Sequence, residues 1–341
     1  MESINRRRII VGSLASLPLG FFGAEVFAAQ SELKISHQFP GGTLTEGDFR
    51  DRLCRKFAAE LDKRSNGALK GVVYPGSSLM KTNSQFSAMR KGALDMSLVP
   101  LSYAGGEIPE LNIGLMPGVV VSYEQGMAWK KAEVGKALTD LLADKGVIIV
   151  SWIWQAGGVA SRAKPIIDPD DAKGLKVRGG SREMDMVLKA AGAAVLSLPS
   201  NEIYAAMQTG ALDAAMTSST SLISFRLEEV AKNLTTGRGK TYWFMFEPLM
   251  ISKAIFDTLP KAQQDLIMTV GAELEAFAME AAKADDEAVA TVYQKAGGKA
   301  YDMSDAVVKK WQAIARDTAW KDYAAKTANC ARILQLAEKT L

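Results

Sequence analysis

The segment Met89-Arg-Lys-Gly-Ala-Leu-Asp95 recurs as Met207-Gln-Thr-Gly-Ala-Leu-Asp213, and this repeat decides the fold class. In each copy the glycine follows a helical stretch, where it permits the left-handed conformation that ends a helix. The aspartate can bond backbone groups in the turn, and a strand then begins. A strand and a proline precede each copy, at Val73-Tyr-Pro75 and at Leu196-Ser-Leu-Pro199. The matching order predicts two similarly built lobes.

The first part of the chain alternates short strands with helices. Apolar residues recur at helical spacing between Phe49 and Leu61, and Asn66-Gly67 supplies the stop signal. A second helix runs through Phe86 and Met89. The strands expected around these helices are Leu33–Ser36, Val72–Tyr74 and Asp95–Val99. This alternation predicts an α/β fold with a largely parallel sheet.

Two later stretches are expected to carry the chain between the lobes, namely the apolar strand Val147–Trp154 and a second strand within residues 241–252. No proline interrupts the helix expected from Pro260 to Lys295, which is long enough to lie across both lobes. We therefore expect two α/β lobes around a cleft that closes by hinge bending. Lobe I is expected at 29–155 plus about 243–280, and lobe II at about 156–242 plus 281–341.

Residues 1–28 have the features of a secretory signal peptide. Arg6-Arg-Arg8 precedes the uncharged run Ile9–Ala24, and small residues precede a cleavage site after Ala28 or, alternatively, after Ala29. A membrane anchor is the weaker alternative, because a spanning helix needs about 20 apolar residues without a proline such as Pro18 in the middle of the run. The arginines resemble a twin-arginine signal, but Asn5 stands where serine or threonine is usual, so Sec and Tat export both stay open. The mature protein is expected in the periplasm.

Composition excludes several classes of protein. The 341 residues carry a net charge of +3 with 48% hydrophobic residues, which is typical of a globular protein and too weakly basic for a nucleic-acid partner. His37 is the one histidine, and Cys54 and Cys330 are the two cysteines, which excludes multi-histidine and multi-cysteine metal centres. In an oxidising compartment the cysteines either form a disulfide or remain two buried thiols. The sequence indicates no cofactor.

Two short matches to catalytic motifs fail on their context. Ser78-Leu-Met-Lys81 has the S-x-x-K spacing of penicillin-recognising enzymes, but the companion motifs S-D-N and K-T-G are missing. Gly239-Lys-Thr241 ends like a phosphate-binding loop, but Leu234 occupies the position of the required earlier glycine. No pair of carboxylates stands out from the solvated helix faces. The sequence therefore predicts a protein that is not an enzyme.

Arg178 is the strongest candidate for a ligand contact. It ends a short strand in which Leu175 and Val177 face one side, Gly179-Gly180 allows a tight exit, and Ser181 can cap the next helix. An arginine at the carboxyl end of a strand in an open α/β sheet points into the ligand crevice. Its planar fork suits a carboxylate held by two hydrogen bonds. The alternative is a surface arginine paired with an acid on a helix.

These features together resemble the solute-binding proteins of TRAP (tripartite ATP-independent periplasmic) transporters, the DctP-type receptors. The likeness covers nearly the whole mature chain. The segments that carry it are Leu33–His37, Phe57–Gly67, Tyr74–Leu79, Lys91–Met96, Lys173–Arg178, Glu202–Tyr204, Gln208–Asp213 and Ile251–Pro260. Each is weak alone, but their order behind a signal peptide makes the resemblance specific.

The resemblance implies a bilobal periplasmic-binding-protein-like fold that closes on a small organic carboxylate. It implies delivery of this ligand to a permease made of a small and a large integral membrane subunit, with a salt bridge from Arg178 to the carboxylate. By position, the cleft neighbours of Arg178 are expected to be Gln38, Trp154, Ser181, Thr217 and Glu247. A periplasmic enzyme acting on an organic acid, or a sensing receptor without a permease, remains as an alternative.

Two departures from the family bear on the ligand. After Asp213 the chain reads Ala-Ala-Met-Thr217-Ser218, where many members have Gly, an acid and then Asn-Pro. Sialic-acid receptors carry an additional ligand-binding arginine where this chain has Gly157-Gly158, which argues against sialic acid. The aromatic group Trp152, Trp154, Trp243 and Phe246 would suit a flatter or more apolar acid. The identity of the acid, assistance by a metal ion and the oligomeric state stay open.

Overall fold

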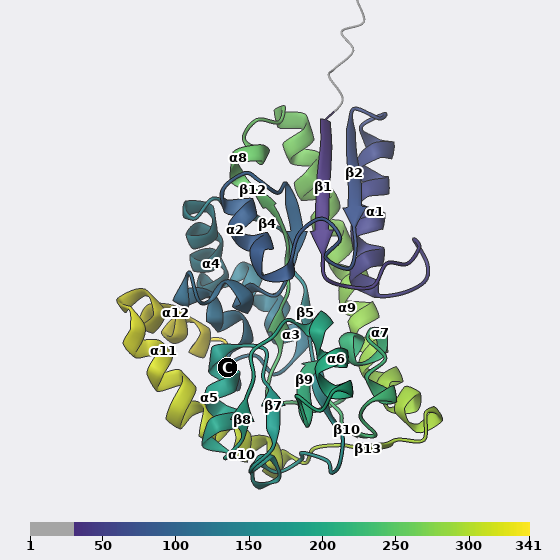
Figure 1. The fold of residues 1–341 in the computed structure, drawn as a ribbon. Helices are drawn as coiled ribbons and strands as arrows, with labels where there is room; N and C mark the ends of the chain where they lie inside the picture. Colours follow the sequence, from purple (N-terminus) through teal and green to yellow (C-terminus); the bar gives the residue numbers. More distant parts are fainter. Residues whose placement is uncertain (1–30) are drawn as a thin grey trace, which may run out of the picture.

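The structure, a computed structural model, describes residues 31–341. Two α/β lobes lie one above the other, each built around its own sheet (Figure 1). The signal peptide expected at residues 1–28 lies outside the described residues. Within the described part, no helix is both long enough and apolar enough to cross a membrane.

One lobe contains a five-stranded sheet in the order β2-β1-β3-β12-β4. Its strands are β1 (Ser31–His37), β2 (Leu69–Tyr74), β3 (Met96–Leu98), β4 (Val147–Ser151) and β12 (Leu249–Ser252). The helices whose chain segments adjoin these strands are α1 (Phe49–Arg64), α2 (Gln85–Arg90), α3 (Tyr123–Ala128), α4 (Glu133–Asp144) and α8 (Lys253–Phe256). The strands and helices predicted for this region are therefore confirmed, with small shifts at their ends.

The other lobe contains a six-stranded sheet in the order β13-β10-β6-β9-β7-β8. Its strands are β6 (Gly157–Ser161), β7 (Lys176–Arg178), β8 (Ala194–Val195), β9 (Ala214–Ser218), β10 (Asn233–Thr235) and β13 (Lys299–Tyr301). The helices that adjoin them are α5 (Arg182–Ala190), α6 (Ile203–Gln208) and α7 (Ser219–Ser224). The strand predicted at Leu196–Leu198 is misplaced, since β8 ends at Val195 and the Leu198 carbonyl bonds a side chain instead.

Both sheets are largely parallel, as predicted, and each contains one strand that runs in the opposite direction. β12 is antiparallel to β3 and β4, and β6 is antiparallel to β9 and β10. Along β12 and β6 the chain enters a sheet after crossing from the other lobe. These two strands therefore run away from the cleft, whereas their neighbours run towards it. Between the lobes, β5 (Trp154–Gln155) and β11 (Met245–Phe246) form a separate two-stranded sheet. Each predicted crossing strand is thus divided in two.

The repeat seen in the sequence corresponds to a structural repeat. Asp95 accepts a hydrogen bond from the backbone N–H of Lys34 at 2.8 Å, and Asp213 accepts one from that of Lys176, also at 2.8 Å. In both places the aspartate begins a strand that runs parallel to the strand of the bonded lysine. The expectation of two similarly built lobes is therefore confirmed at this junction.

Helix α9 (Lys261–Lys295) is the predicted long helix, and it runs alongside both lobes (Figure 1). It packs against α1 and β4 in one lobe and against α7 and β13 in the other. The C-terminal helices are α10 (Asp305–Ala315), α11 (Lys321–Lys326) and α12 (Ala328–Glu338). α10 packs on α5 and α12 on α4, so this segment also contacts both lobes.

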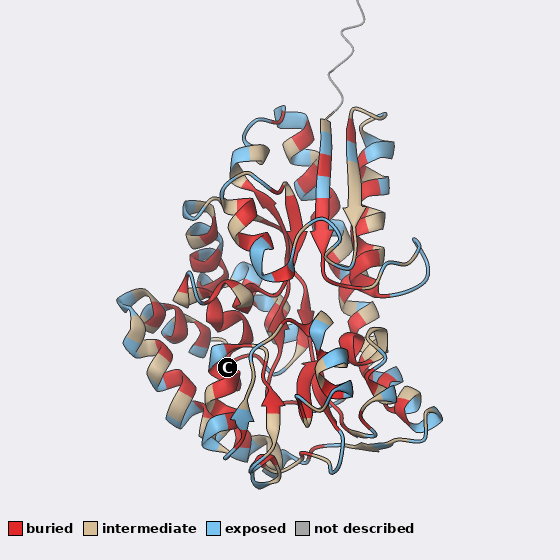
Figure 2. Cartoon of the chain, in the orientation of Figure 1, coloured by how far each residue is buried: buried red, intermediate tan, exposed pale blue. Residues whose placement is uncertain are grey.

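Burial is greatest in the central strands and on the inward helix faces (Figure 2). One apolar cluster runs through both lobes, and a smaller one lies under β9, α7 and the end of α9. Cys54 and Cys330 are both buried as free thiols, which agrees with the second of the two alternatives drawn from the sequence.

Candidate ligand-binding site

The carboxyl ends of strands from the two sheets face each other across the cleft. Arg178 is the last residue of β7, and Tyr103 follows β3 in a short 3-10 turn, Leu101–Ala104. Nη2 of Arg178 donates a hydrogen bond to the Tyr103 hydroxyl at 2.8 Å. Open α/β sheets bind ligands at these strand ends. The two sheet edges therefore converge on Arg178.

The Arg178 guanidinium is buried but incompletely satisfied. Its side chain donates from Nε to the Leu198 carbonyl at 3.0 Å and from Nη1 to the Met216 carbonyl at 2.7 Å, in addition to the Tyr103 bond. A guanidinium has five N–H donors, so one remains on each terminal nitrogen. The residue is 3% exposed, and no described carboxylate forms an ion pair with it. A carboxylate can accept hydrogen bonds from unused guanidinium N–H groups and supply the ion pair that no described residue forms with Arg178.

The backbone after β7 is shaped so that it stays clear of the guanidinium. Gly180 has φ +90°, and a Cβ there would lie 2.8 Å from Nη1 of Arg178. Ser181 then caps α5 by accepting from the Met184 N–H at 3.0 Å, and its hydroxyl donates to the Leu115 carbonyl of the other lobe at 3.1 Å. The predicted cap is confirmed. Through its bond to Leu115, Ser181 helps to join the lobes.

Thr217 and Gln38 also stand at strand ends beside the cleft. Thr217 follows Met216 on β9, and its carbonyl lies 2.2 Å from a Cβ built on Gly157. Gln38 follows β1, which neighbours β3 in the sheet; it is 1% exposed, and neither polar atom of its side chain has a described partner. Buried polar atoms are nearly always hydrogen-bonded, so the Gln38 amide calls for a partner.

The glycines at the start of β6 cannot carry side chains. A Cβ on Gly158 would lie 2.2 Å from the Thr235 carbonyl, and that on Gly157 would also meet the Trp243 ring at 2.4 Å. An arginine at either position would require the backbone to move. This geometry supports the sequence argument against a second arginine in this part of the cleft.

Trp154 lies in an aromatic stack between the lobes. Its ring stacks on Phe246 at 4.9 Å and meets Trp129 edge-on at 5.2 Å, while Trp152 packs on the same Phe246. The indole N–H has no described partner. The structure records no contact between this stack and Arg178, so it does not bring Trp154 together with the strand-end residues.

Glu247 belongs to a second buried cluster, centred on Arg50. Glu247 accepts from Nη1 of Arg50 at 3.2 Å and from the Gln155 amide, and burial raises its pKa to about 7. Arg50 uses its other N–H groups on both oxygens of Asp48 and on two hydroxyls of the opposite lobe, at 3.3 Å and 3.0 Å; these are Ser218 and Ser221. All five donors are engaged, so this arginine has no N–H left for a ligand.

A pocket of about 390 Å³ lies at the mouth of the cleft, between the two lobes. It is lined by residues of both lobes, among them Tyr103, Asn112, Gly180, Ser181 and Leu198. Because Tyr103 and Leu198 both bond the guanidinium, this pocket leads from solvent to the candidate site.

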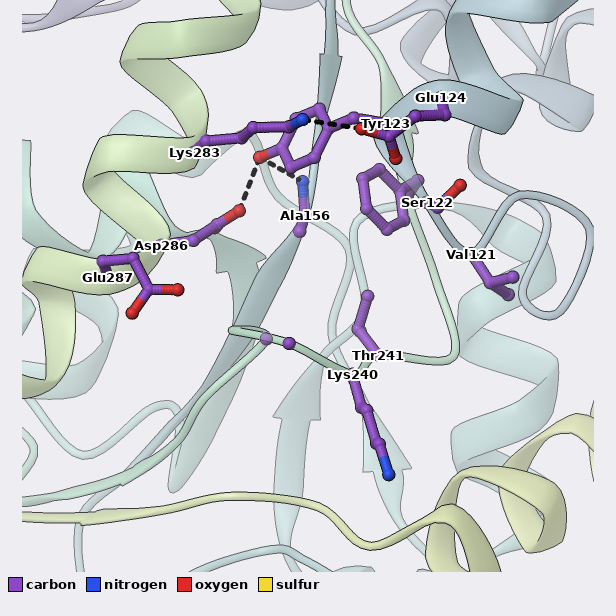
Figure 3. A pocket seen from close by; sticks show the side chains of 13 residues that line it. Val121, Ser122, Tyr123, Glu124, Ala156, Lys240, Thr241, Lys283, Asp286 and Glu287 are labelled. Carbon is purple, nitrogen blue, oxygen red and sulfur yellow. Dashed lines mark hydrogen bonds and ion pairs between the residues drawn. The ribbon is translucent and has the colours of Figure 1, made fainter.

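Another pocket, of about 260 Å³, lies beside the crossing strands and α9 (Figure 3). In it the Tyr123 hydroxyl donates to Asp286 at 2.6 Å and accepts from the Ala156 N–H at 3.3 Å, and Lys283 pairs with Glu124 at 2.7 Å. Burial raises the pKa of Asp286 to about 6. These contacts join α3, the crossing strand and α9 at the hinge, away from Arg178. Among the described residues, no cluster of acidic, histidine or cysteine side chains is placed to hold a metal ion.

Sequence reasoning missed Tyr103 and Arg50. Tyr103 had a usable signal, because it follows β3 just downstream of Asp95, as Thr217 follows Asp213. Arg50 lies within a helix, and its partners Glu247 and Ser218 are far away in the sequence. Nothing in its local pattern indicates burial.

A family model and several relatives match most of this chain. The family described as bacterial extracellular solute-binding protein, family 7 (DctP), matches residues 41–327. A solute-binding protein of Albidiferax ferrireducens is 70% identical over 340 residues, covering 99% of this chain and 100% of that protein. The C4-dicarboxylate-binding periplasmic protein DctP of Rhodobacter capsulatus is 27% identical, covering 71% of this chain and 72% of that protein.

Solved structures show the same fold. A TRAP periplasmic solute-binding protein from Rhodoferax ferrireducens, crystallised with bound malonate, superposes with a TM-score of 0.90 at 74% identity, covering 90% of this chain and 98% of that one. A TRAP protein from Sulfitobacter with bound β-D-galacturonate superposes with a TM-score of 0.82 at 21% identity, covering 91% and 100%.

Proposed function

Because the chain belongs to family 7 of the bacterial extracellular solute-binding proteins, we propose that it captures a small organic carboxylate and delivers it to a TRAP-type permease. One observation supports a carboxylate ligand: the Arg178 guanidinium is buried, forms no ion pair with a described residue, and keeps one unused N–H on each terminal nitrogen. A buried charge is costly unless it is paired and hydrogen-bonded. The anionic ligand supplies that pair.

Closure of the two lobes would complete the site. Hydrogen bonds already join the lobes around Arg178, from Ser181 to Leu115 at 3.1 Å and from the Ser200 N–H to Tyr103 at 3.0 Å. Removing water from the carboxylate–guanidinium pair strengthens it, since the interaction grows as the local dielectric constant falls. In this proposal lobe I comprises 29–155 plus about 243–280, and lobe II about 156–242 plus 281–341.

Several residues are proposed to surround the carboxylate on Arg178. Ser181 caps α5 just after β7, Thr217 follows Met216, whose carbonyl accepts from Arg178, and Gln38 offers an unpartnered buried amide from lobe I. Trp154 and Glu247 were expected here as well, but their recorded contacts are with the aromatic stack and with Arg50. For these two residues we propose a role in shaping the hinge beside the cleft.

The same family membership supports the location and the partners. We propose export to the periplasm with loss of residues 1–28, and docking onto a permease of one small and one large integral subunit. The malonate in the 74%-identical structure makes short dicarboxylates the first ligands to test. Binding without chemical turnover is proposed, since the family is one of transport receptors.

A thermal-shift panel tests this function. The purified protein is unfolded and refolded to remove retained ligand, then heated with malonate, succinate and monocarboxylates, each paired with its uncharged amide. A ligand at about 100 times its Kd adds about 2.7 kcal/mol, a shift of a few degrees. We expect an acid to raise Tm while its amide does not, with the acid recovered unchanged. A panel in which no acid shifts Tm, or in which amides act equally, would overturn the proposal.

A further inference from the structure

The Tyr103 hydroxyl accepts two hydrogen bonds, but its own O–H group donates none to a described residue. It accepts from Nη2 of Arg178 at 2.8 Å and from the backbone N–H of Ser200 at 3.0 Å. A phenol oxygen that accepts twice still carries one O–H donor. No described residue accepts that hydrogen, although both bonded donors belong to the opposite lobe and hold the hydroxyl in place.

This donor borders the open part of the site. Tyr103 is half-buried and lines the pocket at the cleft mouth together with Gly180, Ser181 and Leu198. Of these neighbours, Leu198 accepts a hydrogen bond from Nε of Arg178 at 3.0 Å, and a Cβ built on Gly180 would lie 2.8 Å from Nη1 of Arg178. A ligand whose carboxylate lies on Arg178 therefore places its adjoining atoms near the Tyr103 hydroxyl.

Geometry decides which ligand atom the hydroxyl can reach. The two N–H bonds on one guanidinium nitrogen diverge by about 120°, and each acceptor lies roughly 2.8 Å from the nitrogen. One such acceptor is Tyr103, so a carboxylate oxygen on the other N–H would lie about 5 Å from the hydroxyl. This exceeds hydrogen-bond distance. The acceptor for Tyr103 must be a different oxygen, carried on a carbon close to the carboxylate.

On the premise of the function proposed above, we propose that Tyr103 donates a hydrogen bond to a second ligand oxygen attached at C2 or C3. The site would then select acids with an oxo group, a hydroxyl group or a second carboxylate over plain monocarboxylates. Tyr103 would be a specificity-determining residue contributed by the lobe opposite to Arg178. A site built to hydrogen-bond such an oxygen rejects the analogue that lacks it, because its polar group is left unpaired.

Calorimetric titration with matched acids tests this inference. The probes are propionate, lactate, pyruvate and malonate, together with the four-carbon set butyrate, 2-hydroxybutyrate, 2-oxobutyrate and succinate. In the wild-type protein, at least one oxygen-bearing acid should bind about tenfold or more tightly than the plain acid of equal length. Tyr103→Phe should reduce that ratio to about twofold or less. Tyr301→Phe, on edge strand β13, removes a hydroxyl far from the site and should leave the ratio unchanged.

The failures are distinguishable. If Tyr103→Phe weakens plain and oxygen-bearing acids by the same factor, the hydroxyl acts only on Arg178 and the inference is wrong. A wild-type protein that binds plain acids as tightly as their oxygen-bearing counterparts also overturns it, while the carboxylate function stands. If the wild-type protein binds no carboxylate at all, the proposed function itself fails.

Discussion

The guanidinium of Arg50 and the carboxylate of Glu247 lie 3.2 Å apart, and neither side chain is accessible to solvent. Arg50 enters this contact from α1, Glu247 from the chain between β11 and β12, and Arg50 also reaches hydroxyls on the other lobe. All five donors of Arg50 are engaged in this network, although Oε1 of Glu247 has no described partner, and such linked buried hydrogen bonds hold one another in a fixed geometry. The second buried arginine of the cleft region is thus a structural tie, while Arg178 retains free donors.

Replacing Arg50 by methionine should destabilise the protein severely. The substitution leaves Asp48 and Glu247 buried without their cation, and breaking a buried pair in this way costs about 3–5 kcal/mol. Urea unfolding of the purified protein measures the effect. Lys136→Ala, which removes an exposed pair with Asp140, is the control and should cost less than about 1 kcal/mol. Equal losses from the two variants would contradict the assignment.

Glu183 should make stability depend on pH. It is fully buried on α5 with no hydrogen bond to either carboxylate oxygen; burial raises its pKa to about 7, and Lys326 at 3.7 Å offsets this only in part. Between pH 4.5 and 7 the unfolded chain loses this proton while the folded protein keeps it, so stability falls as pH rises. The loss attributable to Glu183 amounts to about 3 kcal/mol at most.

Glu183→Gln removes that dependence. The free energy of unfolding should be measured at pH 5 and at pH 8. Between these values it should fall less in the variant than in the wild-type protein. Glu133→Gln replaces an exposed carboxylate and is the control. It should change the free energy of unfolding by a similar small amount at both pH values. A Glu183 variant that lost stability mainly at pH 8 would mean that the ionised carboxylate is stabilising.

Gly180→Ala should damage ligand binding beyond its effect on stability. The new Cβ would lie 2.8 Å from Nη1 of Arg178, at a backbone φ of +90°. Gly174→Ala provides the matched control, because that glycine also has a positive φ, +76°, but has nothing within 4 Å of the added Cβ. Both variants should lose about 1–3 kcal/mol of stability from strain. Only the change at Gly180 should weaken carboxylate binding, by about tenfold or more in a calorimetric titration.

The repeated Asp95 and Asp213 explain why the fold was accessible from the sequence. Each aspartate follows a helix end closely and binds the backbone of the neighbouring strand. The same local sequence pattern therefore predicts the helix–strand junction in both lobes. The position of Arg178 at the end of a strand was predictable for the same reason, since the strand, two glycines and a capping serine follow one another in the chain. Features of this kind are defined by residues that lie close together in the sequence.

The remaining features depend on contacts between distant segments. The antiparallel entry of β12 and β6 follows from the path between lobes, which no local pattern records. Glu247 was placed in the cleft by position, whereas its burial against Arg50 joins residues 197 positions apart. Tyr103 bonds to Arg178 only because the opposite lobe brings this arginine to it.

Calorimetric titration of Arg178 variants with malonate is the most direct test of the carboxylate site. Arg178→Ala should weaken binding by a hundredfold or more, consistent with about 3–5 kcal/mol for breaking a buried charge pair. Arg178→Lys should also lose affinity, because a point charge cannot provide the two-pronged contact. Arg162→Ala, an exposed arginine in the same lobe, should bind like the wild-type protein. If Arg178→Ala bound the acid as tightly as the wild-type protein does, the site would be elsewhere and the account would be wrong.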